Sequence, residues 1–260
     1  MTQMKPPLIA KVETAIEALL LEVASHPLCH FSEKSLQVRL ASKLLFDSDF
    51  SMPLPTNIRQ RYKPQLISIE KDEARCLQQY YDEAYKTTPL QMEYGNNLPG
   101  PYRVDLAILN PDDIRRIETV QLQDADNKYL KPLVGIEFGT EKSGWAQMSN
   151  MHLVNDARKV SECDHGYIIN VMRNTNFGCR SKGRHAEKQL RIDRFMESVQ
   201  TLAQNQSSIV WIGMVVNIAF ADITFLAPDG HWMKYELPQD TDQLARAIQA
   251  RFSPITGDTC

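Results

Sequence analysis

Two short stretches, YRVDLAIL at 102–109 and PLVGIEFG at 132–139, decide the fold of this chain. In the first, apolar and polar residues alternate, so that Asp105 lies on the opposite face from the apolar side chains. In the second, Glu137 likewise lies opposite the apolar side chains. A period of two residues is typical of β-strands. We therefore expect two strands, each with a carboxylate near its middle.

Upstream of these strands the sequence predicts helices. Apolar residues recur at helical spacing in 7–25 and in 32–45, and Ser32 is in position to cap the second of these helices. A third helix is expected at 69–86, after a proline-containing loop. A further short strand is expected at 90–95. The segment 110–131 is polar and fits either a helix or a hairpin.

Downstream, strand-like and helix-like segments alternate. Strands are expected at 166–172, where both faces are apolar, and at 209–220, 221–227 and 232–238; helices are expected at 145–163, 180–203 and 241–252. We expect 221–227 to continue the strand at 209–220. PDGH at 228–231 is a hairpin signal, and Asp240 is a candidate cap for the last helix.

This order of elements predicts an α/β protein with a mixed central sheet flanked by helices. The 260 residues can form one large domain with a sizeable core. We interpret 1–260 as a single domain made of three parts. These parts are N-terminal helices at 1–88, a core at 89–205, and C-terminal strands and a helix at 206–260.

Composition narrows the classes of protein further. The net charge is -3, so any nucleic-acid binding must come from a local patch of basic residues. The five cysteines are widely spaced without a CxxC pair, which argues against a zinc ribbon or a disulfide framework and indicates a reducing cytoplasm. We find neither a signal peptide nor an apolar run long enough for a membrane span, and we expect a cytoplasmic protein without a membrane partner.

The carboxylates of Asp105 and Glu137 are the first candidates for chemistry. Either one alone could belong to a solvated strand face. On adjacent strands, however, the two could meet at one point and offer hard oxygen ligands to Mg²⁺ or Mn²⁺. Such a metal lowers the pKa of a bound water and offsets charge on a phosphate in hydrolysis.

The run YRVDLAIL, VGIEFG, a helix containing NDARK and then GYIINVM resembles the core of the PD-(D/E)XK nuclease superfamily. The resemblance covers about residues 30–172 and implies a restriction-endonuclease-like fold. It implies that Asp105 and Glu137 bind Mg²⁺ or Mn²⁺. It also implies an assisting role for Glu33, near the start of the second helix. Glu93 matches a position that is often acidic in that family.

The sequence departs from the family motif at Gly139, where the family has a lysine that acts on the attacking water. Three interpretations stay open: the lysine has migrated, the nuclease is inactive, or the resemblance is misleading. If the lysine has migrated, Lys159 on the following helix is preferred over Lys142, which lies just past the strand.

Basic residues gather between 173 and 194 in an otherwise acidic chain. They could hold a phosphate backbone beside the metal site, because Arg makes bidentate phosphate contacts. The alternative is an ordinary solvated helix face. The candidates for nucleic-acid contact are Arg173, Arg180, Lys182 and Arg184.

The leading hypothesis is therefore a metal-dependent endonuclease that hydrolyses DNA phosphodiester bonds. The alternative is an inactive nuclease-like fold that binds nucleic acid or protein. A homodimer is expected from the resemblance alone, since two active sites are needed to cut two strands. Motifs of serine hydrolases, P-loop NTPases and dinucleotide enzymes are missing from the sequence.

Overall fold

The computed structural model describes residues 6–27, 32–56, 86–95, 103–116, 130–140, 145–174, 182–218 and 220–252. Within these ranges, the side chains of 145–151 and 182–188 are not described. Residues 69–85 of the helix expected at 69–86 lie outside the described residues. None of the described helices combines the length and the apolar character that crossing a bilayer requires.

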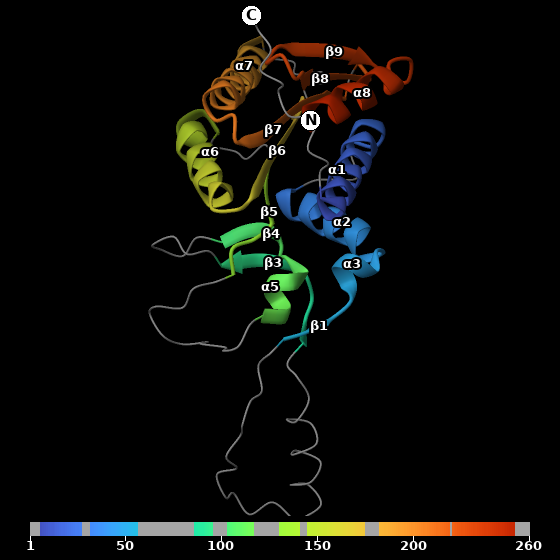
Figure 1. The fold of residues 1–260 in the computed structure, drawn as a ribbon. Helices are drawn as coiled ribbons and strands as arrows, with labels where there is room; N and C mark the ends of the chain where they lie inside the picture. The colour runs from blue at the N-terminus through green and yellow to red at the C-terminus, as the bar shows by residue number, and fades with distance from the viewer. Residues whose placement is uncertain are drawn as a thin grey trace, which may run out of the picture.

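A seven-stranded sheet forms the centre of the molecule, in the order β3-β4-β5-β6-β7-β8-β9. The three central strands β5, β6 and β7 are parallel, and every other neighbouring pair is antiparallel. The structure thus confirms a mixed sheet in an α/β protein (Figure 1). The strands are β3 (Leu90–Gly95), β4 (Arg103–Ile108), β5 (Val134–Thr140), β6 (His165–Asn174), β7 (Ile209–Asn217), β8 (Asp222–Leu226) and β9 (Trp232–Glu236).

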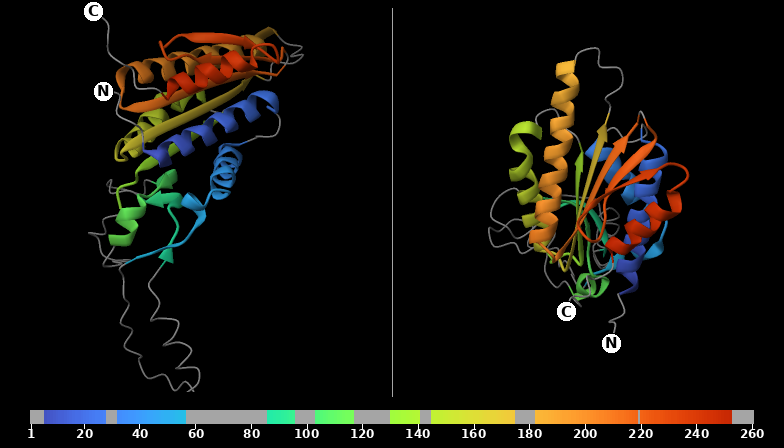
Figure 2. Two further views of the ribbon diagram at one scale, coloured as in Figure 1. Left: turned by 45° about the vertical axis from the view of Figure 1, so that its right-hand side comes forward. Right: turned by 90° about the horizontal axis from the view of Figure 1, so that it is seen from above.

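Helices cover both faces of the sheet. On one face lie α1 (Pro7–Ser25), α2 (Glu33–Leu45) and α8 (Thr241–Arg251), and on the other lie α6 (Trp145–Ser161) and α7 (Lys182–Asn205). Figure 2 shows the two helical layers from above, with the sheet between them. The remaining elements near β3 and β4 are short: α3 (Ser48–Ser51), α5 (Pro111–Arg116), β1 (Leu54–Pro55) and β2 (Lys86–Thr87).

The alternation of side chains along the strands divides the core into two layers. In β6, Tyr167 and Ile169 pack into the layer of α1, α2 and α8, while Ile168 and Met172 pack against α6 and α7. This confirms that the strand expected at 166–172 is buried on both faces. Burying such large apolar side chains contributes about 1.5–3 kcal/mol each, so both helical layers are held firmly to the sheet.

One local prediction about the C-terminal part is wrong, and another is confirmed only in position. The segment 221–227 does not continue the preceding strand: β7 ends at Asn217, the chain turns, and β8 returns antiparallel to it. Ala221 has a φ of 51°, which permits the reversal. Asp240 occupies the cap position of α8 but makes no capping hydrogen bond, because its Oδ2 accepts from the backbone N–H of Glu236 at 2.8 Å. The expected cap by Ser32 is confirmed.

An ion-pair cluster joins α1 to α2. Arg39 donates to both carboxylate oxygens of Glu22, at 2.7 and 3.0 Å, and the Lys43 ammonium lies 2.8 Å from Glu22 Oε2. The hydrogen bond from Arg39 dominates, and it lowers the pKa of Glu22 to about 2 although partial burial opposes the shift. Because the folded state prefers the ionised carboxylate, this cluster stabilises the protein above pH 4.5 and loses its effect as the pH falls toward 2.

We therefore predict that Glu22→Gln is less stable than the wild type at pH 7 by about 1–2 kcal/mol, with solvent screening of Arg39 limiting the loss. The difference should shrink as the pH falls from 4.5 toward 2, since the carboxyl is then protonated first in the unfolded chain and finally, near pH 2, in the folded protein as well. Urea unfolding at pH 7 and near pH 2 measures both differences. A gap of equal size at the two pH values would contradict an ionic origin.

Candidate active site

The candidate site begins where the ladder between β4 and β5 ends. The last backbone pair on this side is Leu106 with Ile136. Beyond it, the N–H of Asp105 donates to Glu137 Oε1 at 3.1 Å, and the N–H of Phe138 donates to Asp105 Oδ2 at 2.9 Å. Each carboxylate therefore bonds to the backbone of the opposite strand. The structure brings Asp105 and Glu137 together on the face of the sheet that α6 covers.

Helix α6 places an ammonium group against this pair. Lys159 Nζ lies 2.6 Å from Glu137 Oε2 and 2.9 Å from Asp156 Oδ1. The other oxygen of Asp156 lies 3.1 Å from His152 Nδ1. The three residues of α6 are spaced by three and four positions, so they share one face of the helix. A continuous polar chain thus runs from His152 to the carboxylate of Glu137.

This group of charges is largely shielded from water, with Asp105 and Lys159 half-buried. Glu137 is 1% exposed and Asp156 2%, and 15% of the Lys159 side chain is exposed. When ionised, the carboxylates of Asp105, Glu137 and Asp156 carry three negative charges against the single positive charge of Lys159. The buried group therefore has a net charge of −2. Burying unbalanced charge is costly, so the folded protein favours a proton or a cation here.

The pKa values of the site follow from this imbalance. Burial raises the pKa of Asp105 to about 6, and the nearby Glu33 carboxylate adds to the shift. Burial and the carboxylates of Asp105 and Asp156 raise the pKa of Glu137 well above its usual range. Burial alone lowers the pKa of Lys159, but the neighbouring carboxylates outweigh it and raise that pKa. Lys159 is consequently a permanent cation at neutral pH.

Helix α2 supports Asp105 from the side of β3. The Gln37 side chain is 1% exposed and donates to the backbone carbonyl of Asp105. Its amide also lies 3.5 Å from Glu93 Oε1, and Lys34 forms an ion pair with the same carboxylate. Glu33, at the start of α2, is near enough to influence the pKa of Asp105. The start of α2 therefore borders the site.

Several predicted residues are not placed at the site. Lys142 and Arg180 lie outside the described residues, and the side chains of Lys182 and Arg184 are not described. Arg173 pairs with Val216 near the end of β6, on the α1 face of the sheet and thus opposite to Glu137. The catalytic role of Lys142 and the nucleic-acid contacts of the four other residues stay predictions.

Sequence reasoning gave too little weight to two residues. Asp156 lies one turn before Lys159, a spacing that an ordinary ion pair explains, and the structure shows that Asp156 also pairs with His152 and is buried. Gln37 lies one turn after Glu33, and the structure buries it against the backbone of Asp105. The spacing of three or four residues along each helix was the available signal. This spacing does not show that the residues are buried, and burial gives these contacts their strength.

The donor set fits a hard divalent cation in part. No set of three or more His, Cys, Asp or Glu side chains in the described part of the chain is arranged to share a metal ion. Two carboxylates on neighbouring strands are nevertheless sufficient for Mg²⁺, which keeps several waters and often uses only one or two protein carboxylates. Asp105 and Glu137 are the residues that could hold it.

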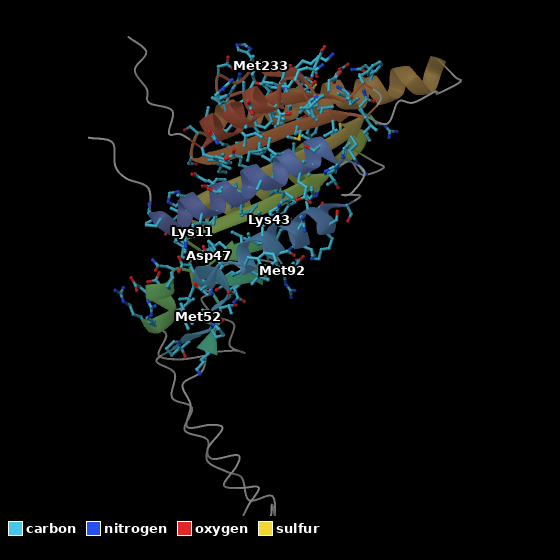
Figure 3. All side chains as sticks on the ribbon, turned by 90° about the vertical axis from the view of Figure 1, so that its right-hand side faces the viewer. Lys11, Lys43, Asp47, Met52, Met92 and Met233 are labelled. Atoms are coloured by element: carbon cyan, nitrogen blue, oxygen red, sulfur yellow. The ribbon has the colours of Figure 1, made fainter. Side chains whose placement is uncertain are left out.

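A concave region lies between α1 and α2 and has a volume of about 600 Å³. Figure 3 labels Lys11, Lys43 and Asp47, which belong to its lining. Its cations are matched by carboxylates: Lys11 lies 2.7 Å from Asp47, and Lys43 binds Glu22. Because these ion pairs leave no surplus charge to bind a ligand, we place the candidate active site at Asp105 and Glu137 on the sheet.

Comparisons with known proteins identify no relative. No protein-family model, no curated protein and no solved structure matches this chain.

Removing the ammonium of Lys159 should destabilise the protein strongly. We predict that Lys159→Met costs about 3–5 kcal/mol at pH 8, because two buried carboxylates lose their cation. The double variant Glu137→Gln, Lys159→Met should recover part of this loss. Chemical denaturation measures both.

Lys131→Met provides the matched control. Lys131 pairs with Asp164 at 2.6 Å, but both side chains are about half exposed. Exposed pairs contribute less than about 1 kcal/mol, so this variant should unfold almost like the wild type. A loss for Lys159→Met no larger than that of the control would show that the site charges are solvated.

Proposed function

We propose that this protein is a metal-dependent nuclease of restriction-endonuclease-like fold that hydrolyses DNA phosphodiester bonds. One observation carries the proposal: the site of Asp105, Glu137, Asp156 and Lys159, in which Glu137 and Asp156 are buried and the other two are half-buried, has a net charge of −2 when ionised. A single Mg²⁺ or Mn²⁺ ion would neutralise that charge. The order of the motif strands and α6 agrees with the resemblance seen in the sequence.

Asp105 and Glu137 would hold the ion. Asp105 Oδ2 accepts a hydrogen bond from Phe138, which orients the carboxylate, and its other oxygen would bind the ion. The Glu137 carboxylate is held by the N–H of Asp105 and by Lys159. When bound, the ion would supply Lewis-acid stabilisation of the charge that develops on the phosphate.

Lys159 takes the place of the missing motif lysine in this proposal. It reaches Glu137 from the helix that covers the sheet, at 2.6 Å. Because its pKa is raised, its ammonium stays protonated and acts as a hydrogen-bond donor and positive charge, not as a base. It can orient the attacking water or stabilise a phosphate oxygen. Glu33 would assist from the start of α2.

The proposed reaction is in-line hydrolysis. A water oxygen forms a bond to phosphorus while the bond from phosphorus to the 3′-oxygen breaks. The water gives up a proton and the leaving oxygen gains one, so the products are a 3′-hydroxyl and a 5′-phosphate. This polarity follows from the family resemblance and is part of the proposal.

Cleavage of supercoiled plasmid and of single-stranded DNA tests the function. We expect cleavage that requires Mg²⁺ or Mn²⁺ and falls at least about 100-fold in Asp105→Asn and in Glu137→Gln, because each variant removes a charged metal ligand. Calorimetry should show weaker Mn²⁺ binding by both variants. Lys131→Met is the control and should cleave normally.

A second candidate function is an inactive nuclease-like module that binds nucleic acid or protein. The observation in its favour is that both oxygens of Glu137 have partners within the protein, the Asp105 N–H and Lys159, while position 139 holds glycine. Such a site can be stable without any metal. Absence of cleavage on every DNA substrate, together with absence of Mn²⁺ binding, would favour this candidate and contradict the nuclease.

A further inference from the structure

The side chain of Asn170 is the most unusual polar group in the sheet. It lies in the middle of β6 and is completely buried. Within the described part of the chain, neither its Nδ2 nor its Oδ1 has a hydrogen-bond partner. An amide that is withdrawn from water without a partner costs about 1–3 kcal/mol. Buried polar groups of native proteins are nearly always paired, so this exception requires an explanation.

The position of Asn170 connects it to the candidate site. In the parallel register of β5 and β6, Glu137 pairs with Ile168 and Gly139 pairs with Asn170. Side chains two residues apart on a strand point to the same face. Asn170 therefore lies on the face of Glu137, one step closer to the carboxyl ends of the parallel strands. Ligands of α/β sheets bind at those ends.

The side chain of Asn170 also occupies the space that a side chain at position 139 would need. A Cβ added to Gly139 would collide with Oδ1 of Asn170. The carboxamide thus lies over β5, where the side chain of residue 139 would start. On its other side, Asn170 pairs with Gly213 of β7. The amide fills the position on β5 from which the motif lysine would project.

We propose that the carboxamide of Asn170 is a binding group of this site, and that its Nδ2 donates a hydrogen bond to an oxygen of the bound phosphodiester. This inference rests on the proposed nuclease function. It explains why position 139 is glycine: the amide needs that space. It also explains the missing partner, because the partner belongs to the substrate. A donor that is held in place and shielded from water stabilises developing charge more than a hydrated one.

The test uses Asn170→Leu, which keeps the size of the side chain and removes its polar atoms. We expect its melting temperature to rise by several degrees without metal, because an unpaired amide is replaced by a methyl-bearing side chain. Its affinity for Mn²⁺ should stay within about threefold of the wild type. Its cleavage rate on duplex DNA should fall by about 100-fold or more, as for loss of one preorganised donor. If Asn170 had only a structural role, Asn170→Leu would not gain stability while losing cleavage.

Ile168→Leu is the matched control. It changes packing on the same face of the same strand without removing a polar group, so stability and cleavage should stay close to the wild type. Asn170→Ala is measured beside Asn170→Leu, and the same loss of cleavage with retained Mn²⁺ binding is expected.

Cleavage by Asn170→Leu or Asn170→Ala within threefold of the wild type would overturn the inference and leave the nuclease function standing. A marked loss of stability in Asn170→Leu would also overturn it, because it would show that the amide has a structural partner within the protein. If the wild type itself does not cleave DNA, the proposed function fails, and the inference fails with it.

Discussion

The structure depends on an exchange of hydrogen bonds between β4 and β5. Where their backbone ladder stops, the N–H groups of Asp105 and Phe138 bond to carboxylates of the opposite strand. Those bonds keep the two strands in register and hold the carboxylates inside the protein. They also make the end of the ladder the place where negative charge concentrates.

The charge imbalance explains why α6 lies where it does. A buried carboxylate pair without a cation would be very costly, and Lys159 supplies one from the helix that packs on that face. Asp156 and His152 extend the same polar chain toward the surface. The apolar residues of α6 and α7 pack against β6 and β7 around it, so the charged group is embedded in a well-packed layer.

Stability and chemistry are in tension at this site. The apolar layer formed by α1, α2 and α8 with the sheet is the larger of the two core clusters in the described residues. The opposite layer contains an excess of negative charge and the unpaired amide of Asn170, both of which oppose folding. Groups that destabilise a fold and gather at one point are typical of functional sites. The apolar groups and the charged groups lie on opposite faces of the sheet because side chains alternate along each strand.

The sequence by itself determined the elements and their faces. Periods of two and of about four residues predicted β4, β5, α1 and α2 correctly, because local geometry decides which side chains share a face. It also identified the opposed carboxylates of Asp105 and Glu137. It failed where the chain reverses between β7 and β8, because strand propensity is equal on both sides of that turn.

Only the tertiary structure decided the strength and the partners of the polar groups. The contact of Lys159 with Glu137 joins residues 22 positions apart, and the collision of Asn170 with any side chain at 139 depends on the register of two parallel strands. Neither is visible in a local pattern. Burial then turns these contacts from weak surface pairs into strong ones, because a carboxylate or an amide that has left water depends on its protein partners or on a ligand.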